Sequence, residues 1–296
     1  MSFRRIGLVV HPSRDLDEVL AEIEAWSSEH DVELGQVSVA GQTRRVADPL
    51  EPAGCDLLVA LGGDGTTLAA LHQAARVSRP VLGIACGSVG MLTSVAHDRV
   101  GDALDQVAAD RWTAVDVPGL EIGCDGATPE VGINDLAVLR DGPGQAIVSV
   151  VVDDQLYARV AGDGLVVASA LGSSAYSMAA GGPLLAPGAD GMVITPLSPH
   201  GGCAPPLVTS AGSSITLTVD AGYGGVRYDV DGQNTPLRGR VLTVRTRPAY
   251  ATLVELAGEE PRLAGLRRRK LVMDSPRVLI RDLRPEQAGP GGLPHT

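Results

Sequence analysis

LLVALGGDGTTLAALHQAA, residues Leu57–Ala75, joins an apolar run to a helical pattern through a glycine-rich turn. Leu57–Leu61 is short and entirely apolar, which is typical of a buried strand. In the second half, apolar residues recur at helical spacing, and Thr66 or Thr67 is predicted to cap the resulting helix. We therefore expect a strand, a turn and a helix in this order.

The turn itself reads Gly62-Gly63-Asp64-Gly65-Thr66. Its glycines can adopt positive φ and leave no side chain in the path of a ligand. Backbone N–H groups in such a turn, where a helix begins, form a concavity that suits phosphate. Asp64 follows a buried strand, at the edge where open α/β sheets bind ligands, and its carboxylate suits a hydroxyl group or Mg²⁺. The plainer alternative is a tight turn in which Asp64 only caps the helix.

Composition limits the classes of protein and of site. A chain of 296 residues with a hydrophobic share of 44% is typical of a soluble globular protein with one large or two ordinary domains. The net charge of −11 argues against nucleic acid as a partner, because phosphate backbones need clustered cations. Lys270 is the only lysine, so a P-loop of the GKT or GKS type is absent. The four cysteines lie far apart and predict reduced thiols rather than a zinc site or disulfides.

No feature of the sequence points to a membrane. The sequence shows no signal-peptide pattern and no apolar run long enough to span a bilayer. We therefore expect a cytoplasmic protein without a membrane partner.

The pattern changes once along the chain. Strand and helix patterns alternate in residues 1–111, which predicts a Rossmann-like parallel α/β domain. In residues 112–265 the apolar residues come in short alternating runs separated by turn residues, which predicts a β-rich, sandwich-like domain. We expect residues 266–296 to pack back on the N-terminal domain and to end in a disordered tail from about Pro285.

Two stretches of the second domain are unusual for strands, because one contains polar residues and the other is rich in small side chains. Asn134-Asp135 interrupts an apolar run, which predicts either a β-bulge or a site that faces a ligand. Leu165–Ala170 reads as a strand, and Gly172–Gly182 then supplies glycine, alanine and serine around one tyrosine. Small residues let a flat ring lie against the backbone, and Tyr176 can stack on that ring. A tightly packed serine–glycine turn is the alternative.

Taken together, these motifs resemble the bacterial NAD kinases. The resemblance rests on GGDGT after a strand, on Asn134-Asp135, on the block GDGLVVASALGSSAYSMAAGGP at 162–183 and on Asp231–Gln233, in the same order. It covers the chain from about Ile6 to Leu271. The long block is specific to that family, whereas GGDGT alone is shared with diacylglycerol and sphingosine kinases.

The resemblance implies transfer of the γ-phosphoryl group of ATP to the 2′-hydroxyl of the adenosine ribose of NAD, which gives NADP, with Mg²⁺ as the divalent cation. It implies that Asp64 accepts the proton and that Gly65 lies against the ribose. It implies a homodimer or homotetramer whose sites are completed by a neighbouring subunit. We assign no metal-ligating side chains. The implied NAD-binding residues are Asn134, Asp135, Asp163, Ser174, Ala175, Tyr176, Ser177, Met178 and Ala179, with Gln233 closing the pocket from the β-rich domain.

The sequence also departs from the family pattern. Asn134-Asp135 stands where Asn-Glu is usual, and the segment Ala85–Leu92 lacks the familiar arginine and aromatic residue. A second arginine is replaced by Pro205, and a basic residue by Ala161. Two other functions remain open: a kinase of another hydroxyl substrate such as a lipid, and a catalytically silent NAD(H)- or NADP-binding sensor. An aromatic share of 3% and the lack of a basic amphipathic helix do not favour the lipid kinase.

Overall fold

The computed structural model describes residues 3–87, 90–93, 95–124, 126–258 and 262–282. The chain divides into two compact units, Met1–Glu259 and Glu260–Thr296, which are described separately below.

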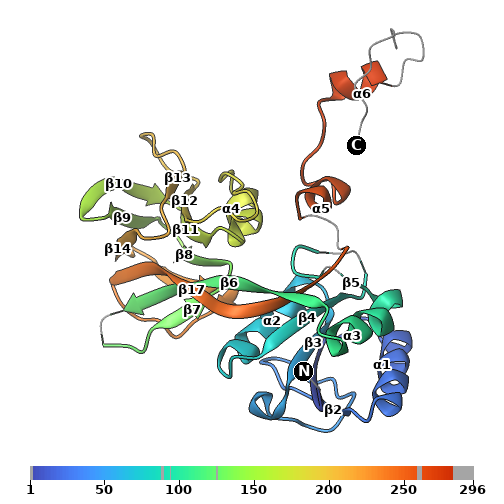
Figure 1. Ribbon diagram of the computed structural model, residues 1–296. Coiled ribbons are helices and arrows are strands. Elements are labelled where there is room, and N and C mark those ends of the chain that lie inside the picture. The colour runs from blue at the N-terminus through green and yellow to red at the C-terminus, as the bar shows by residue number, and fades with distance from the viewer. Residues whose placement is uncertain (1–2, 88–89, 94, 125, 259–261, 283–296) are drawn as a thin grey trace. The chain divides into compact units, whose positions relative to one another are not determined.

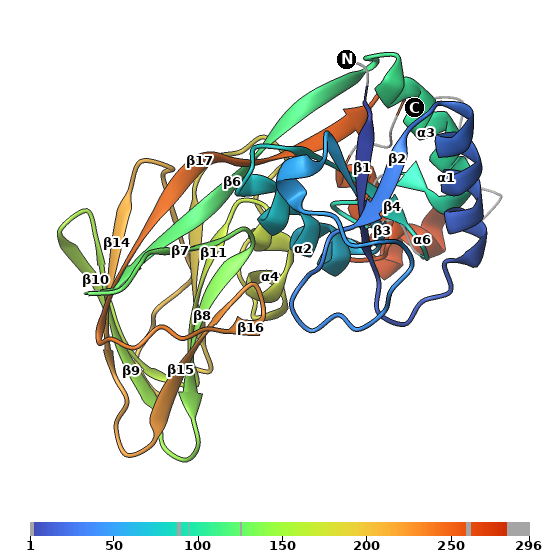
Figure 2. The same ribbon diagram turned by 90° about the horizontal axis from the view of Figure 1, so that it is seen from below.

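The first part of the larger unit is a parallel sheet with helices on both faces (Figures 1 and 2). Four strands pair in parallel in the order β2-β1-β3-β4: β1 (Arg5–Val10), β2 (Glu33–Gln36), β3 (Leu57–Gly62) and β4 (Pro80–Ala85). The short strand β5 (Val95–Ala96) adds to the end of β4. The helices are α1 (Asp17–Glu29), α2 (Asp64–Ala75) and α3 (Val100–Ala108).

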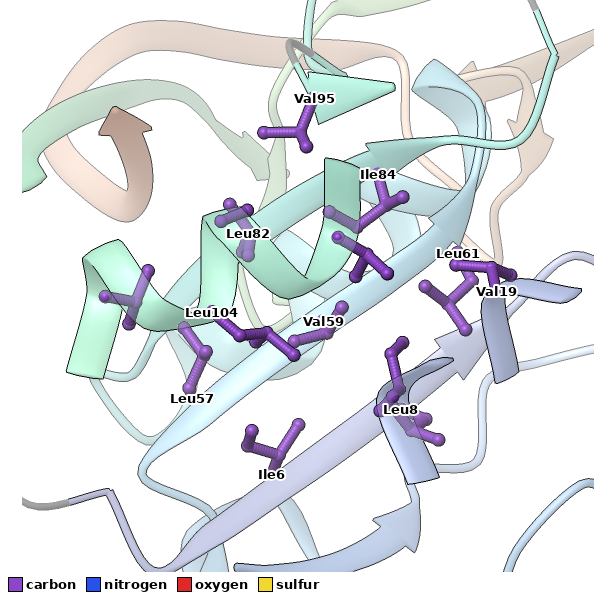
Figure 3. Packing of buried hydrophobic residues seen from close by; sticks show 14 of the residues in the cluster. Ile6, Leu8, Val19, Leu57, Val59, Leu61, Leu82, Ile84, Val95 and Leu104 are labelled. Carbon is purple, nitrogen blue, oxygen red and sulfur yellow. The ribbon is translucent and has the colours of Figure 1, made fainter. Parts of the chain in front are cut away.

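Strand β3 shows how this sheet is stabilised. Successive side chains of a strand point to opposite faces. Leu57, Val59 and Leu61 are therefore buried with residues of α1 and α3 on one face, as Figure 3 shows. Leu58 and Ala60 are buried with residues of α2 on the other face. The buried strand predicted from the apolar run at 57–61 is thus confirmed.

The second part of the larger unit is an antiparallel sandwich. One of its sheets contains β6 (Trp112–Cys124), β7 (Glu130–Gly132), β9 (Ala146–Val152), β10 (Gln155–Gly162), β14 (Ser214–Asp220) and β17 (Val241–Leu256). The other has the order β13-β12-β11-β8-β15-β16: β13 (Leu207–Thr209), β12 (Met192–Leu197), β11 (Gly164–Ser169), β8 (Asp135–Asp141), β15 (Gly225–Val230) and β16 (Gln233–Asn234). Facing side chains such as Val167 and Leu217 lie in one shared core. The predicted fold class, α/β followed by a β-sandwich, is confirmed.

Strand β17 joins the two parts. Its first half pairs with β14 in antiparallel fashion, and near its end Thr252 and Leu253 pair in parallel with Pro80 and Val81 of β4. The sandwich sheet and the α/β sheet are therefore one continuous sheet of 11 strands. Strand β6 follows β17 along its length, and the two strands run together from one part to the other (Figure 1).

The smaller unit contains α5 (Arg262–Arg268) and α6 (Pro276–Asp282). The tail predicted to be disordered from about Pro285 lies outside the described residues, and the packing of residues 266–296 on the N-terminal domain stays a prediction. Within the part of the chain that the structure describes, no helix has the length and apolar character needed to cross a membrane.

Candidate functional site

The glycine-rich turn lies at a switch point of the parallel sheet. Strand β2 lies on one side of β1 and strand β3 on the other, so the chain leaves β1 and β3 in opposite directions across the sheet. Open α/β sheets bind ligands at such points, beyond the carboxyl ends of the strands. His11–Arg14 follow β1 there, and Gly63 follows β3.

Helix α2 begins earlier than the sequence predicts. It starts at Asp64, and the N-cap is Gly63 in an extended conformation, so the prediction of a cap at Thr66 or Thr67 is wrong. The N–H groups of both threonines donate to the carbonyl oxygen of Gly63, at 3.0 Å each, and are already inside the helix. The helix therefore begins two residues after β3 ends at Gly62, and Asp64 lies in its first turn.

Two backbone groups hold the carboxylate of Asp64. Met91 N–H donates to Oδ2 at 2.9 Å, and Leu92 N–H donates to Oδ1 at 2.8 Å. A Cβ atom at Gly90 would lie only 1.9 Å from Oδ1, so this close approach requires glycine. These two contacts fix the orientation of the carboxylate.

A cleft of about 370 Å³ opens over this turn, which is the size of a small-molecule site. Gly63, Asp64, Gly65 and Thr66 line one part of it, and Gln233 lines it from β16 of the sandwich. A Cβ atom added at Gly65 would meet nothing within 4 Å, so this glycine faces open space. The structure therefore brings Gln233 together with the GGDGT turn.

Arg14 also lines this cleft, and the sequence analysis did not select it. Its Nη1 donates to the carbonyl oxygen of Cys86 at 2.6 Å and to that of Gly62 at 3.4 Å. The guanidinium thus lies across the ends of β3 and β4. The one available signal was its position, four residues after the end of the first strand.

Asp231 organises the Asn134-Asp135 segment. Its Oδ1 accepts the N–H groups of Asn134 at 2.6 Å and Asp135 at 3.1 Å, and its Oδ2 accepts that of Ile133 at 2.8 Å. His72 Nε2 of α2 lies 2.7 Å from the same Oδ2, and the Asp231 side chain is only 5% exposed. One buried carboxylate therefore links the helix that begins with Asp64 to the segment that begins β8.

The carboxyl group of Asp135 is almost completely buried. Burial raises its pKa to about 7, the nearby Asp231 carboxylate adds to this rise, and a hydrogen bond from the backbone N–H of Tyr176 opposes it. Asp135 therefore lies at the start of the short helix α4 (Tyr176–Ala179).

The serine-rich segment packs directly on Asn134. Ser169 N–H donates to the Asn134 carbonyl oxygen at 2.8 Å, and a Cβ atom at Gly172 would lie 1.9 Å from that oxygen. Strand β11 and the turn after it are thus closed against β8, which brings Asn134 and Asp135 together with the predicted wall at Ser174–Ala179.

The members of that wall are not equivalent. The Tyr176 side chain is exposed, at 41%, and is accessible to a ligand. Ser177 is completely buried, and its hydroxyl lies 2.8 Å from that of Thr195 in β12. Ser174 donates its hydroxyl to the Leu171 carbonyl oxygen at 3.0 Å. The two serines therefore support the turn through hydrogen bonds, whereas Ala175 and Met178 are half-buried and Ala179 is exposed.

Asp163 lies far along the strand from Asp135 and the serine-rich turn. Gly164 lies opposite Leu139 at one end of β11, whereas Ala168 lies opposite Asp135 at the other end. At about 3.3 Å per residue, roughly 20 Å of strand separates Asp163 from the serine-rich turn. Its carboxylate pairs with Arg140 Nε at 2.6 Å. Hydrogen bonds from Arg140 and Ser198 hold its pKa below the ordinary value.

Comparison with known proteins agrees with this geometry. The model of the ATP-NAD kinase N-terminal domain matches residues 6–112, and that of the ATP-NAD kinase C-terminal domain matches residues 134–256. The NAD kinase of Chlorobium phaeobacteroides is 32% identical over 279 residues, which cover 90% of this chain and 96% of the relative. The NAD kinase of Chlorobaculum tepidum is 33% identical over 222 residues, 74% of this chain and 77% of the relative.

Two solved structures share the fold. Yeast NADH kinase in complex with NADH superposes with a TM-score of 0.77 at 20% identity, over 93% of this chain and 89% of its own. An NAD kinase from Archaeoglobus fulgidus in complex with ATP superposes with a TM-score of 0.73 at 24% identity, over 91% of this chain and 100% of its own. Since both domain models match in the expected order and a relative above 30% identity spans nine-tenths of the sequence, this chain belongs to the ATP-NAD kinase family.

Proposed function

We propose that this chain is an NAD kinase, which transfers the γ-phosphoryl group of ATP to the 2′-hydroxyl of the adenosine ribose of NAD and gives NADP. Its membership in the family supports this function over a lipid kinase or a silent sensor. The observation that carries the chemistry is the carboxylate of Asp64, held by backbone N–H groups in a cleft beside glycines.

Phosphoryl transfer requires mainly positioning and neutralisation of charge. Asp64 would orient the ribose hydroxyl and accept its proton as the bond to phosphorus forms. A carboxylate can accept about four hydrogen bonds, so its contacts with Met91 and Leu92 are compatible with a further one from substrate. Gly65 faces open space and would let the ribose approach closely.

Mg²⁺ is part of the proposal. Among the residues that the structure describes, no group of three or more His, Cys, Asp or Glu side chains is arranged to hold a metal ion. We expect an ion that is held by the substrate phosphates and keeps several waters. When bound, Mg²⁺ would neutralise charge on the phosphates.

NAD would lie between the GGDGT turn and the sandwich. Asn134 and Asp135 would contact its polar groups, Tyr176 would stack on one of its rings, and Ala175, Met178 and Ala179 would line the wall. Ser174 and Ser177 would support this wall through their hydrogen bonds. Gln233, which lines the cleft opposite the turn, would close the pocket.

Oligomerisation is the second part of the proposal. Asp163 lies at the far end of β11, so it would serve an NAD site only if a second copy brought it there. We therefore expect a homodimer or homotetramer. Mixing Asp64→Asn with Asp163→Asn should restore activity if sites are shared between subunits, whereas a monomer by light scattering with full activity would contradict this arrangement.

A cytoplasmic location also belongs to the proposal. The four cysteines are free, and burial raises the pKa of the Cys55 and Cys86 thiols to about 11. Thiols without disulfide partners are typical of a reducing compartment.

One assay tests the proposed activity. Purified chain is incubated with Mg²⁺, ATP and NAD, and NADP is followed with an NADP-specific dehydrogenase. We expect NADP that depends on ATP, and no phosphorylated lipid when a diacylglycerol replaces NAD. Tight NAD binding without NADP would instead indicate the sensor.

A further inference from the structure

We propose that Arg14 contacts the phosphate groups of the phosphoryl donor in the cleft that contains Asp64. The proposal rests on the proposed function in one respect, namely that the donor carries a chain of phosphates.

The position of the guanidinium is fixed by backbone. Its Nη1 donates to the carbonyl oxygens of Gly62 and Cys86, at the ends of two neighbouring parallel strands. A Cβ atom at Gly63 would lie 3.6 Å from Nη2, and one at Gly87 would lie 2.7 Å from Nη1. Glycines therefore flank the guanidinium on two sides, and Gly63 directly precedes Asp64.

Part of the guanidinium remains available for a ligand. Arginine has five N–H donors in a planar fork. The two on Nη1 are used by the strand ends, and no described residue accepts a hydrogen bond from Nε or Nη2. No carboxylate among the described residues lies within 4.0 Å of Arg14 either, unlike its neighbour Arg44, which is 4.0 Å from Asp17. The fork is the geometry that matches phosphate oxygens.

An anionic phosphoryl donor needs a positively charged residue in this cleft. Asp64 contributes a negative charge where an anionic donor would bind. His11 also lines the cleft, but burial, Arg14 and Arg44 lower its pKa from 6.5, so it is mostly neutral at pH 7. Of the described residues that line the cleft, Arg14 is thus the one with a permanent positive charge. Its charge would draw the phosphates to the side of the turn where the hydroxyl and Asp64 meet.

Arg14 could instead serve only to hold the two strand ends together. This structural role predicts that its loss disturbs the turn as a whole, so that NAD binding falls together with phosphate binding. A direct contact predicts that the affinity for a phosphate chain falls and that the affinity for NAD does not.

The experiment measures binding of inorganic tripolyphosphate to the full chain by calorimetry, without NAD, and then NAD binding alone. Arg14→Gln should weaken tripolyphosphate binding by roughly 10- to 100-fold, as expected for a charged hydrogen bond. NAD affinity and melting temperature should stay near wild type. Arg44→Gln is the matched control, because Arg44 donates to the Arg14 carbonyl oxygen but does not line the cleft, and it should bind tripolyphosphate as wild type does.

Equal losses of tripolyphosphate and NAD affinity, or unchanged tripolyphosphate affinity in Arg14→Gln, would overturn the proposal. If Arg14→Gln does not fold, Arg14→Lys decides: it keeps the charge but lacks the planar fork of donors. A Lys variant that keeps its NAD affinity and binds tripolyphosphate more weakly than wild type supports the contact, whereas equal losses of both affinities, or unchanged tripolyphosphate affinity, overturn it. A wild type that forms no NADP but binds tripolyphosphate through Arg14 would refute the proposed function and leave this inference standing.

Discussion

The two halves of the site differ in how they are held. At the GGDGT turn, backbone N–H groups of Met91 and Leu92 hold Asp64, and glycines provide the space. On the sandwich side, a buried carboxylate, Asp231, gathers three backbone N–H groups, and a buried hydroxyl of Ser177 lies against Thr195. The first half is thus sensitive to added side-chain volume, whereas the second is sensitive to loss of a polar group.

The largest effect is expected from one added methyl group at Gly90. A Cβ atom there would lie 1.9 Å from Oδ1 of Asp64, so Gly90→Ala must displace either the loop or the carboxylate. Displacing a general base costs roughly 10²- to 10⁴-fold in kcat, and we expect a lower melting temperature as well. Steady-state kinetics and calorimetric melting measure both.

Gly65→Ala is the matched control for volume. The added methyl group meets nothing within 4 Å, and alanine favours a helix over glycine by about 0.5–1 kcal/mol. The melting temperature should therefore be unchanged or higher, while NAD affinity falls if the ribose lies against this glycine. A stable, fully active Gly90→Ala would show that the backbone clamp on Asp64 is not needed.

The next effect concerns the buried carboxyl group of Asp135 in the sandwich half of the site. The folded state keeps the proton on Asp135 up to about pH 7, whereas the unfolded chain releases it near 3.8. Between these values unfolding releases a proton, so the free energy of unfolding falls as pH rises. Asp135→Asn cannot ionise and should be more stable than wild type by up to about 4 kcal/mol near pH 8, at 1.36 kcal/mol per pKa unit.

The difference in stability between Asp135→Asn and wild type should vanish near pH 4, where both side chains are neutral. Urea unfolding at several pH values measures it. A difference that does not depend on pH would contradict the raised pKa of Asp135.

The smallest effects are expected in the short helix α4, where Tyr176 would contact the ligand and Ser177 supports the fold. Tyr176→Ala should weaken NAD binding by about 1–3 kcal/mol through lost stacking, with an unchanged melting temperature because the ring is exposed. Ser177→Ala leaves the buried Thr195 hydroxyl without its partner and should lower the free energy of unfolding by about 1–3 kcal/mol. If both variants lost stability alone, Tyr176 would have no part in the NAD site.

Local sequence patterns predicted the parts of the fold that local chemistry determines. The apolar run at 57–61 and the glycines after it predicted the strand and the turn, and the change of pattern after residue 111 predicted a sandwich. The motifs led to the family, which the comparisons confirm. The Thr66 or Thr67 cap was wrong because the N-cap is Gly63, three residues before Thr66.

Contacts between distant segments could not be predicted in this way. Leu253 pairs with Val81, and this pairing merges the two sheets, but no local pattern encodes which strands become neighbours. The link from His72 to Asp231 spans two domains, and Arg14 is placed beside the turn by the strand order. The register of β11 separates Asp163 from the other implied NAD-binding residues.

The most direct test of the central claim is the kcat of Asp64→Asn, measured beside its NAD affinity and melting temperature. Asparagine keeps the size of the side chain but accepts through one oxygen, so one backbone N–H of the Met91–Leu92 pair loses its acceptor, at a cost of about 1 kcal/mol. We predict a fall in kcat of about 10²- to 10⁴-fold with NAD affinity near wild type. Asp135→Asn should instead change mainly the KM for NAD. Near-normal turnover of Asp64→Asn would contradict the assignment of Asp64 as the proton acceptor.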